Sequence, residues 1–242
     1  MKLSIDARNG SAPASGNGIS PSAGTKHPEH LLLAIWAEQA RKAAASLPPL
    51  PTFAEALALE RETAFRELGY TFWNQELLEG MATRMREEVW LELAAGTGRL
   101  TAELSRREVA VTATDDYSQL SGRVRDAERV IEYGEWVAPL SAREAVARFR
   151  PRAVLCAWPP FGSGLALDLL AGTLPGSEEM ALLVCIGEPG GATEAPLHPH
   201  ELPPGWALEA WPECEAYLVS FNDPPPGFGW RTYSRLLVYR RV

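Results

Sequence analysis

The stretch that decides the fold is VWLELAAGTGRL, at residues 89–100. A short apolar run leads into a turn with glycines at positions 96 and 98, and helix-forming residues follow. Glycine lets a backbone approach a ligand at positions where any Cβ would collide. Strand, glycine turn and helix in this order predict a nucleotide-type ligand site in an open α/β sheet.

After this stretch, short apolar runs alternate with helical segments. We expect strands at 109–114, 130–133, 153–157 and 181–186, with helices between them. Such alternation predicts βαβ units and a parallel sheet with helices on both faces. Two late runs, 216–221 and 234–240, alternate like strands and predict an antiparallel hairpin at the sheet edge. The expected fold class is therefore a doubly wound, mostly parallel α/β sheet.

The residues before the first strand predict helices at 30–45, 52–68 and 74–86. Residues 1–26 are rich in Ser, Gly, Ala and Pro and predict a flexible tail. The chain of 242 residues fits one large domain with an appendage. We therefore expect a tail at 1–26, a helical cap at 27–87 and a Rossmann-like domain at 88–242.

Composition excludes several classes. Apolar residues make up 46% and charged residues 22%, which is ordinary for a soluble protein. The net charge of 23 − 31 = −8 argues against a general binder of nucleic acid or anionic membranes. No apolar run approaches the roughly 20 residues of a membrane span, and the start has no apolar signal segment. Three scattered cysteines without a CxxC pair predict buried, reduced thiols in a cytoplasmic protein with no zinc site.

An acidic residue follows the second predicted strand. Asp115 stands 17 residues after Gly98, and a carboxylate there can accept hydrogen bonds from both hydroxyls of a ribose. A dinucleotide fingerprint would place a third glycine where this chain has Thr101. The pattern therefore disfavours a nicotinamide-dependent oxidoreductase.

Together, Glu92-x-Ala94-x-Gly96-Thr97-Gly98 and Asp115 resemble the class I S-adenosylmethionine-dependent methyltransferases over about residues 88–190. The resemblance implies S-adenosyl-L-methionine as cofactor and S-adenosyl-L-homocysteine as product. The turn would hold the amino-acid part and Asp115 the ribose, and Glu135 matches the position that reads the adenine amino group. Ala94 departs from the family, which commonly has glycine there. The implied cofactor-binding residues are Glu92, Ala94, Gly96, Thr97, Gly98, Asp115, Asp116, Glu135, Trp136 and Ala157.

A second motif, Trp158-Pro159-Pro160-Phe161, follows the fourth strand, where parallel sheets bind ligands. It resembles the Asp/Asn-Pro-Pro-aromatic motif of amino-group methyltransferases. Trp158 replaces the hydrogen-bonding Asp or Asn of that motif, which weighs against amino-group chemistry. We take Trp158, Phe161 and Glu188 as candidate catalytic residues. The candidate substrate contacts are Tyr70, Trp73, Asn74, Pro159 and Pro160.

A wider set of matches, at 70–74, 158–160, 186–191 and 239–241, resembles a little-characterised group of bacterial methyltransferase-like proteins. We therefore expect methyl transfer to an N or O nucleophile of a small molecule or peptide, within specialised metabolism by analogy. Two alternatives stay open: an amino-group methyltransferase acting on nucleobase or protein, and a non-catalytic module that binds an adenosyl ligand. No nucleic-acid or membrane partner is expected, and the sequence does not predict the oligomeric state.

Overall fold

The computed structural model describes residues 28–118, 133–159, 162–189, 193, 201–224 and 233–242. The predicted tail at 1–26 lies outside these residues. A seven-stranded sheet crosses the molecule in the order β3-β2-β1-β4-β5-β7-β6. All strands run parallel except β7, which is antiparallel to both neighbours. The strands are β1 Val89–Leu93, β2 Ala110–Asp115, β3 Val137–Pro139, β4 Ala153–Ala157, β5 Leu182–Gly187, β6 Trp206–Glu209 and β7 Arg235–Arg241.

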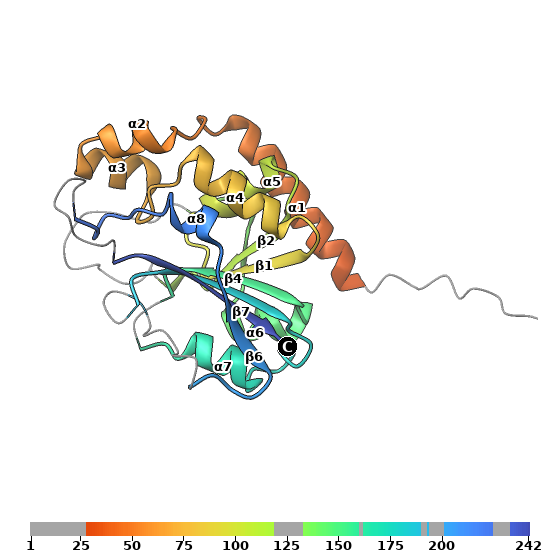
Figure 1. Cartoon of the computed structure of the whole chain (residues 1–242). Coiled ribbons are helices and arrows are strands. Elements are labelled where there is room, and N and C mark those ends of the chain that lie inside the picture. The colour runs from red at the N-terminus through yellow and green to blue at the C-terminus, as the bar shows by residue number, and fades with distance from the viewer. Residues whose placement is uncertain (1–27, 119–132, 160–161, 190–192, 194–200, 225–232) are drawn as a thin grey trace, which may run out of the picture.

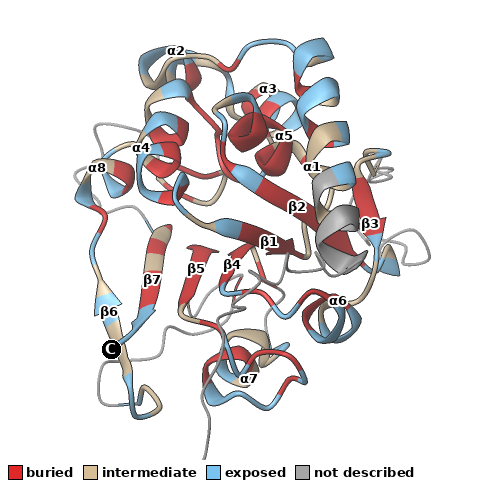
Figure 2. Ribbon diagram, turned by 90° about the vertical axis from the view of Figure 1, so that its right-hand side faces the viewer, coloured by how far each residue is buried: buried red, intermediate tan, exposed pale blue. Residues whose placement is uncertain are grey.

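Helices cover both faces of the sheet, as Figure 1 and Figure 2 show. One face carries α2, α3, α4, α5 and α8, and the other carries α6 and α7. Helix α1 lies along α5 and β2. The predicted doubly wound α/β class is confirmed. The helices are α1 Pro28–Ser46, α2 Phe53–Ala58, α3 Arg61–Leu68, α4 Gln75–Met85, α5 Arg99–Arg106, α6 Ala142–Phe149, α7 Leu165–Ala171 and α8 Pro212–Glu215.

Alternate residues of the central strands supply the two cores. Trp90, Leu155 and Val184 point to the α4 face, where they pack with the helices that precede β1. Leu91 and Leu183 point to the face covered by α6 and α7. The predicted helical cap thus shares one apolar core with the sheet, so α4 is one of the sheet's covering helices.

The predicted helix at 52–68 is two helices. Leu59 has extended backbone angles, φ −67° and ψ 144°, which end α2. Glu60 then caps α3, because its carboxylate accepts the backbone N–H groups of Glu62 and Thr63. An acidic N-cap inside an otherwise helical pattern is the physical reason for the break.

The C-terminal hairpin was predicted with the wrong first strand. β7 pairs with Trp206–Glu209, whereas residues 216–221 follow α8 and make one isolated bridge, Ser220 with Thr71. Leu218 and Val219 in this segment are buried in the core of the α4 face. Their apolar pattern therefore reflects packing under the helices. The strand expected at 130–133 lies mostly outside the described residues, and β3 is Val137–Pro139.

A buried ion cluster fixes α5, the helix that starts at the glycine turn. The Glu103 side chain is fully buried and lies 3.1 Å from Arg107 and 3.2 Å from Arg99. The Arg99 guanidinium also donates to the Pro48 carbonyl, at 2.9 Å, and Arg106 donates to Leu47 at 3.0 Å. Paired and hydrogen-bonded charges of this kind hold α5 against the end of α1. The first residue of α5, Arg99, directly follows the glycine turn, so these contacts also fix the end of the turn.

Candidate functional site

The glycine turn lies between β1 and α5 at the carboxyl edge of the sheet. Ala94, Gly96 and Gly98 all have left-handed backbone angles, with φ of 53°, 54° and 72°. The Gly96 N–H donates to Asp115 Oδ2 at 2.8 Å, which fastens the turn to the end of β2. The predicted turn and the predicted acidic residue are therefore in direct contact. This edge is where the strand order reverses, which is where open α/β sheets bind ligands.

The surroundings explain the two glycines of the turn in different ways. A Cβ on Gly98 would lie 2.5 Å from Val137 and 2.6 Å from the Trp136 indole nitrogen. A Cβ on Gly96 would meet nothing within 4 Å. Gly98 is thus explained by packing inside the protein, whereas the space at Gly96 is open to an incoming ligand.

Asp115 is nearly buried, and both of its oxygens accept backbone N–H groups. Oδ2 binds Gly96, and Oδ1 binds Tyr117 at 2.9 Å. Asp116 is exposed, and hydrogen bonds from Ser118 lower the pKa of its carboxyl group. A carboxylate has about four lone-pair positions, so Asp115 keeps acceptor capacity for ligand hydroxyls.

Glu92 is buried beneath the turn. Its carboxylate accepts a hydrogen bond from the Thr101 hydroxyl. Burial raises the pKa of Glu92 to about 7, against the opposing effect of Thr101, and nearby Asp115 raises it further. In the sequence, Thr101 stands where a dinucleotide fingerprint has its third glycine. In the structure it is the hydrogen-bond partner of the acidic residue that begins the motif.

Glu135 does not occupy the position predicted for it. It was expected after the third strand, but it is exposed and precedes β3, which starts at Val137. The neighbouring Trp136 packs on the turn, where its indole N–H donates to the Gly98 carbonyl at 3.0 Å. Trp136 therefore packs against the turn through a structural hydrogen bond, and its predicted cofactor contact stays a prediction, while Glu135 lies at the amino end of β3.

Trp158 stands beyond the end of β4, next to half-buried Ala157. Strand alternation would point its ring toward α6 and α7. Its left-handed φ of 59° accompanies a turn of the indole toward the other face, where the N–H donates to the Thr71 hydroxyl at 2.8 Å. The Trp158 ring lies 5.0 Å from the ring of Tyr70, centroid to centroid. Strained backbone of this kind is often found at ligand sites.

A polar pair joins the end of β5 to the residue after Phe221. Asn222 Nδ2 donates to Glu188 Oε2 at 2.7 Å. The backbone N–H of Trp158 donates to the Ile186 carbonyl at 2.6 Å, which brings the ends of β4 and β5 together. Sequence reasoning did not single out Asn222. In the sequence, Asn222 is only a polar residue at the start of a proline-rich run, and it stands 34 positions from Glu188.

Trp73 and Asn74 are buried in the core. Asn74 is fully buried, and its side-chain oxygen accepts the Leu77 N–H as the cap of α4. Its amide nitrogen donates to the carbonyls of Phe72 and Tyr217. These bonds make Asn74 a structural residue, which corrects its predicted place in a substrate wall. Pro160 and Phe161 lie outside the described residues.

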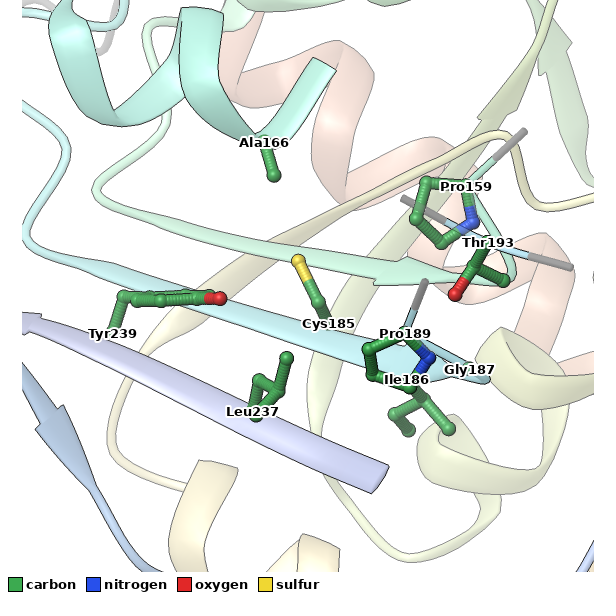
Figure 3. Close-up of a pocket in the computed structure, with 9 residues that line it drawn as sticks. All are labelled: Pro159, Ala166, Cys185, Ile186, Gly187, Pro189, Thr193, Leu237 and Tyr239. Carbon is green, nitrogen blue, oxygen red and sulfur yellow. The ribbon is translucent and has the colours of Figure 1, made fainter. Parts of the chain in front are cut away.

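A small cavity lies on the other side of β5, as Figure 3 shows. Its volume is about 20 Å³, and its lining includes Pro159, Cys185 and Tyr239. A space of this size fits a single water, so it does not accommodate a substrate. In the described residues, no group of three or more His, Cys, Asp or Glu side chains is placed to hold a metal ion.

No protein-family model matches the chain, and no curated protein matches it in sequence. Among solved structures, the chain is similar to HI0767 from Haemophilus influenzae, a proposed methylase, with 16% identity and a TM-score of 0.38. That match covers 76% of this chain and 99% of the other. It is also similar to yhhF from Escherichia coli, a proposed methyltransferase, with 18% identity, a TM-score of 0.38 and coverage of 81% and 89%.

At TM-scores this low, neither likeness carries an argument about activity. The described helices include none that combines the length and apolar character needed to cross a bilayer.

Proposed function

We propose that this protein is an S-adenosyl-L-methionine-dependent methyltransferase acting on a small molecule or peptide. The observation that carries the proposal is the contact between the Gly96 N–H and the Asp115 carboxylate at the switch point of the sheet. It places a left-handed glycine turn beside an acidic residue at the end of the next strand. This is the local geometry that the sequence resemblance requires.

The residues at the ends of β1 and β2 fit an adenosyl-amino-acid ligand. The open space at Gly96 admits a ligand close to the backbone. Asp115 supplies acceptors for ribose hydroxyls, and buried Glu92 lies beneath the turn, where it accepts a hydrogen bond from Thr101. When bound, S-adenosyl-L-methionine supplies a methyl group on a sulfonium sulfur, which takes back the carbon–sulfur bond pair when a nucleophile takes the methyl.

The chain's own contribution would be to position the methyl acceptor. β4 pairs with β1, and β5 pairs with β4. Trp158, at the end of β4, is therefore one strand away from the end of β1 where the glycine turn begins, and the Tyr70 ring lies against Trp158. Holding two reactants in line at about 3 Å is worth up to roughly 7–11 kcal/mol in the best-oriented cases. Acidic net charge and the absence of Asp or Asn at position 158 both favour a small molecule or peptide over a nucleobase.

Calorimetry with S-adenosylmethionine, S-adenosylhomocysteine and NAD tests the proposal. We expect both adenosyl compounds to bind and NAD to bind much more weakly. Asp115→Asn replaces one backbone-bonded oxygen by an NH₂ group, which disturbs both the turn and the ribose contact. Its affinity should fall about 10- to 100-fold, the cost of roughly 1–3 kcal/mol for an unsatisfied buried group.

Asp168→Asn is the matched control, since Asp168 is a carboxylate on α7 that bonds locally to Thr173. Binding of NAD without either adenosyl compound, or equal affinities of the two variants, would overturn the proposal.

A further inference from the structure

A row of aromatic rings ends at the sheet's ligand edge. Phe65 packs edge-on against Tyr70, with ring centroids 4.8 Å apart, and also lies 4.8 Å from Phe221. Tyr70 in turn faces Trp158 at 5.0 Å and an interplanar angle of 35°. Tyr70 is 49% exposed although its ring has neighbours on two sides. The row therefore presents a supported aromatic surface to the solvent.

The backbone at this surface is fixed from two directions. The Phe221 N–H donates to the Tyr70 carbonyl at 2.8 Å, so the segment carrying Asn222 adjoins the segment carrying Tyr70. The Trp158 indole is held by Thr71. A pair of rings held in this way is pre-organised for a flat ligand, because little side-chain entropy is lost on binding.

The Glu188–Asn222 pair gives this surface a negative end. Because the Asn222 NH₂ donates to Glu188, the amide oxygen of Asn222 is left as a second acceptor beside the carboxylate. In the described parts of the chain, no Lys, Arg or His forms an ion pair with Glu188. Two arginines come near this surface: Arg61 lies over the Phe221 ring at 5.5 Å, and Arg235 pairs across the sheet with Gly187.

We infer that this surface binds a planar aromatic molecule that carries a protonated amine. Its ring packs against Tyr70 and Trp158, and its ammonium lies between Glu188 and the amide oxygen of Asn222. Aromatic faces attract cations, and the carboxylate adds a full opposite charge. The inference rests on the proposed function in one respect, that this molecule is the methyl acceptor. Polyanions such as nucleic acids are repelled by the same carboxylate.

The test uses three probes that share one ring: tyramine, tyrosol and 4-hydroxyphenylacetate. They end in an ammonium, a neutral hydroxyl and a carboxylate. Calorimetry on the full chain should rank them in that order. Tyramine should bind about tenfold tighter than tyrosol, because one exposed cation–π contact and one partly exposed ion pair each contribute modestly.

Glu188→Gln separates charge from shape. It keeps an acceptor for Asn222 but removes the charge, so tyramine affinity should fall about fivefold while tyrosol affinity stays the same. Glu87→Gln is the control, since Glu87 is an exposed carboxylate at the amino end of β1. Tyr70→Leu keeps an apolar side chain but removes the ring face, and should weaken all three probes.

Equal binding of the three probes, no tyramine binding, or identical behaviour of the two Gln variants would overturn the inference. Failure of the proposed function looks different. In that case tyramine would bind as expected while neither adenosyl compound binds the wild-type protein.

Discussion

The two halves of the ligand edge are built in different ways. The β1–β2 half is local, because the turn at 94–98 and Asp115 come from two consecutive strands and meet through a hydrogen bond from the Gly96 N–H to the Asp115 carboxylate. The β4–β5 half gathers Tyr70, Trp158, Glu188 and Asn222 from four distant segments. The local half is fixed by backbone geometry, whereas the assembled half depends on side-chain packing. Substitutions should therefore damage the two halves in different ways.

The largest expected effect compares the two turn glycines. Gly98→Ala adds a Cβ that collides with Trp136 and Val137 at a left-handed φ. We expect a loss of about 3–4 kcal/mol in unfolding free energy, from overpacking and the left-handed penalty together. Gly96→Ala meets open space and should lose only the left-handed penalty, about 1–2 kcal/mol.

Urea unfolding measures the stabilities, and calorimetry with S-adenosylhomocysteine measures the site. Gly96→Ala should lose proportionally more affinity than stability, because its new methyl group fills ligand space. Equal stability losses for the two variants would contradict the different packing of the two glycines.

A smaller effect of about 3 kcal/mol concerns Glu92 in the same half. Burial raises its pKa to about 7, while an unfolded Glu titrates near 4.3. Protonated Glu92 therefore favours the native state below about pH 4, and this contribution is lost as the pH rises through 7. Glu92→Gln should remove that loss, so the decline in stability between pH 5 and pH 8 should shrink by about 3 kcal/mol.

Urea unfolding at several pH values checks this prediction. Glu87→Gln, which changes an exposed carboxylate, should keep the wild-type slope. A Glu92→Gln profile that parallels the wild type would show that Glu92 is ionised in the native protein at every pH tested.

The local half could be predicted from the sequence because its signals are local. A strand, two glycines and an acidic residue 17 positions later predict the turn, and this pattern does not depend on how the surrounding helices pack. The capping box that Thr52 and Glu55 form at the start of α2 depends on residues three positions apart and is local in the same way. The central parallel strands were predicted for a related reason, since burial on both faces leaves a continuous apolar run.

The assembled half could not be predicted, because its contacts depend on tertiary packing. Nothing near Asn222 in the sequence specifies Glu188 as its partner. Asn74 was placed in the site although asparagine before an apolar helical run is a typical N-cap, which is its role in the structure. Glu135 was misplaced because the third strand is only three residues long, too short for its apolar pattern to mark where it starts.

The smallest expected effect is in the assembled half. Thr71→Val keeps the side-chain shape but removes the acceptor of the Trp158 indole N–H. Because Trp158 is only partly buried, its N–H can find water, and we expect a loss of about 1 kcal/mol in unfolding free energy. Thr83→Val is the control, since Thr83 is an exposed residue of α4 whose hydroxyl bonds within its own helix.

The two variants should differ in ligand binding more than in stability. Without Thr71, the Trp158 ring is free to leave the Tyr70 face, so tyramine affinity should fall severalfold while S-adenosylhomocysteine affinity stays unchanged. Loss of both affinities together would mean that the cofactor half also depends on Thr71, and the division of the edge into a local and an assembled half would be wrong.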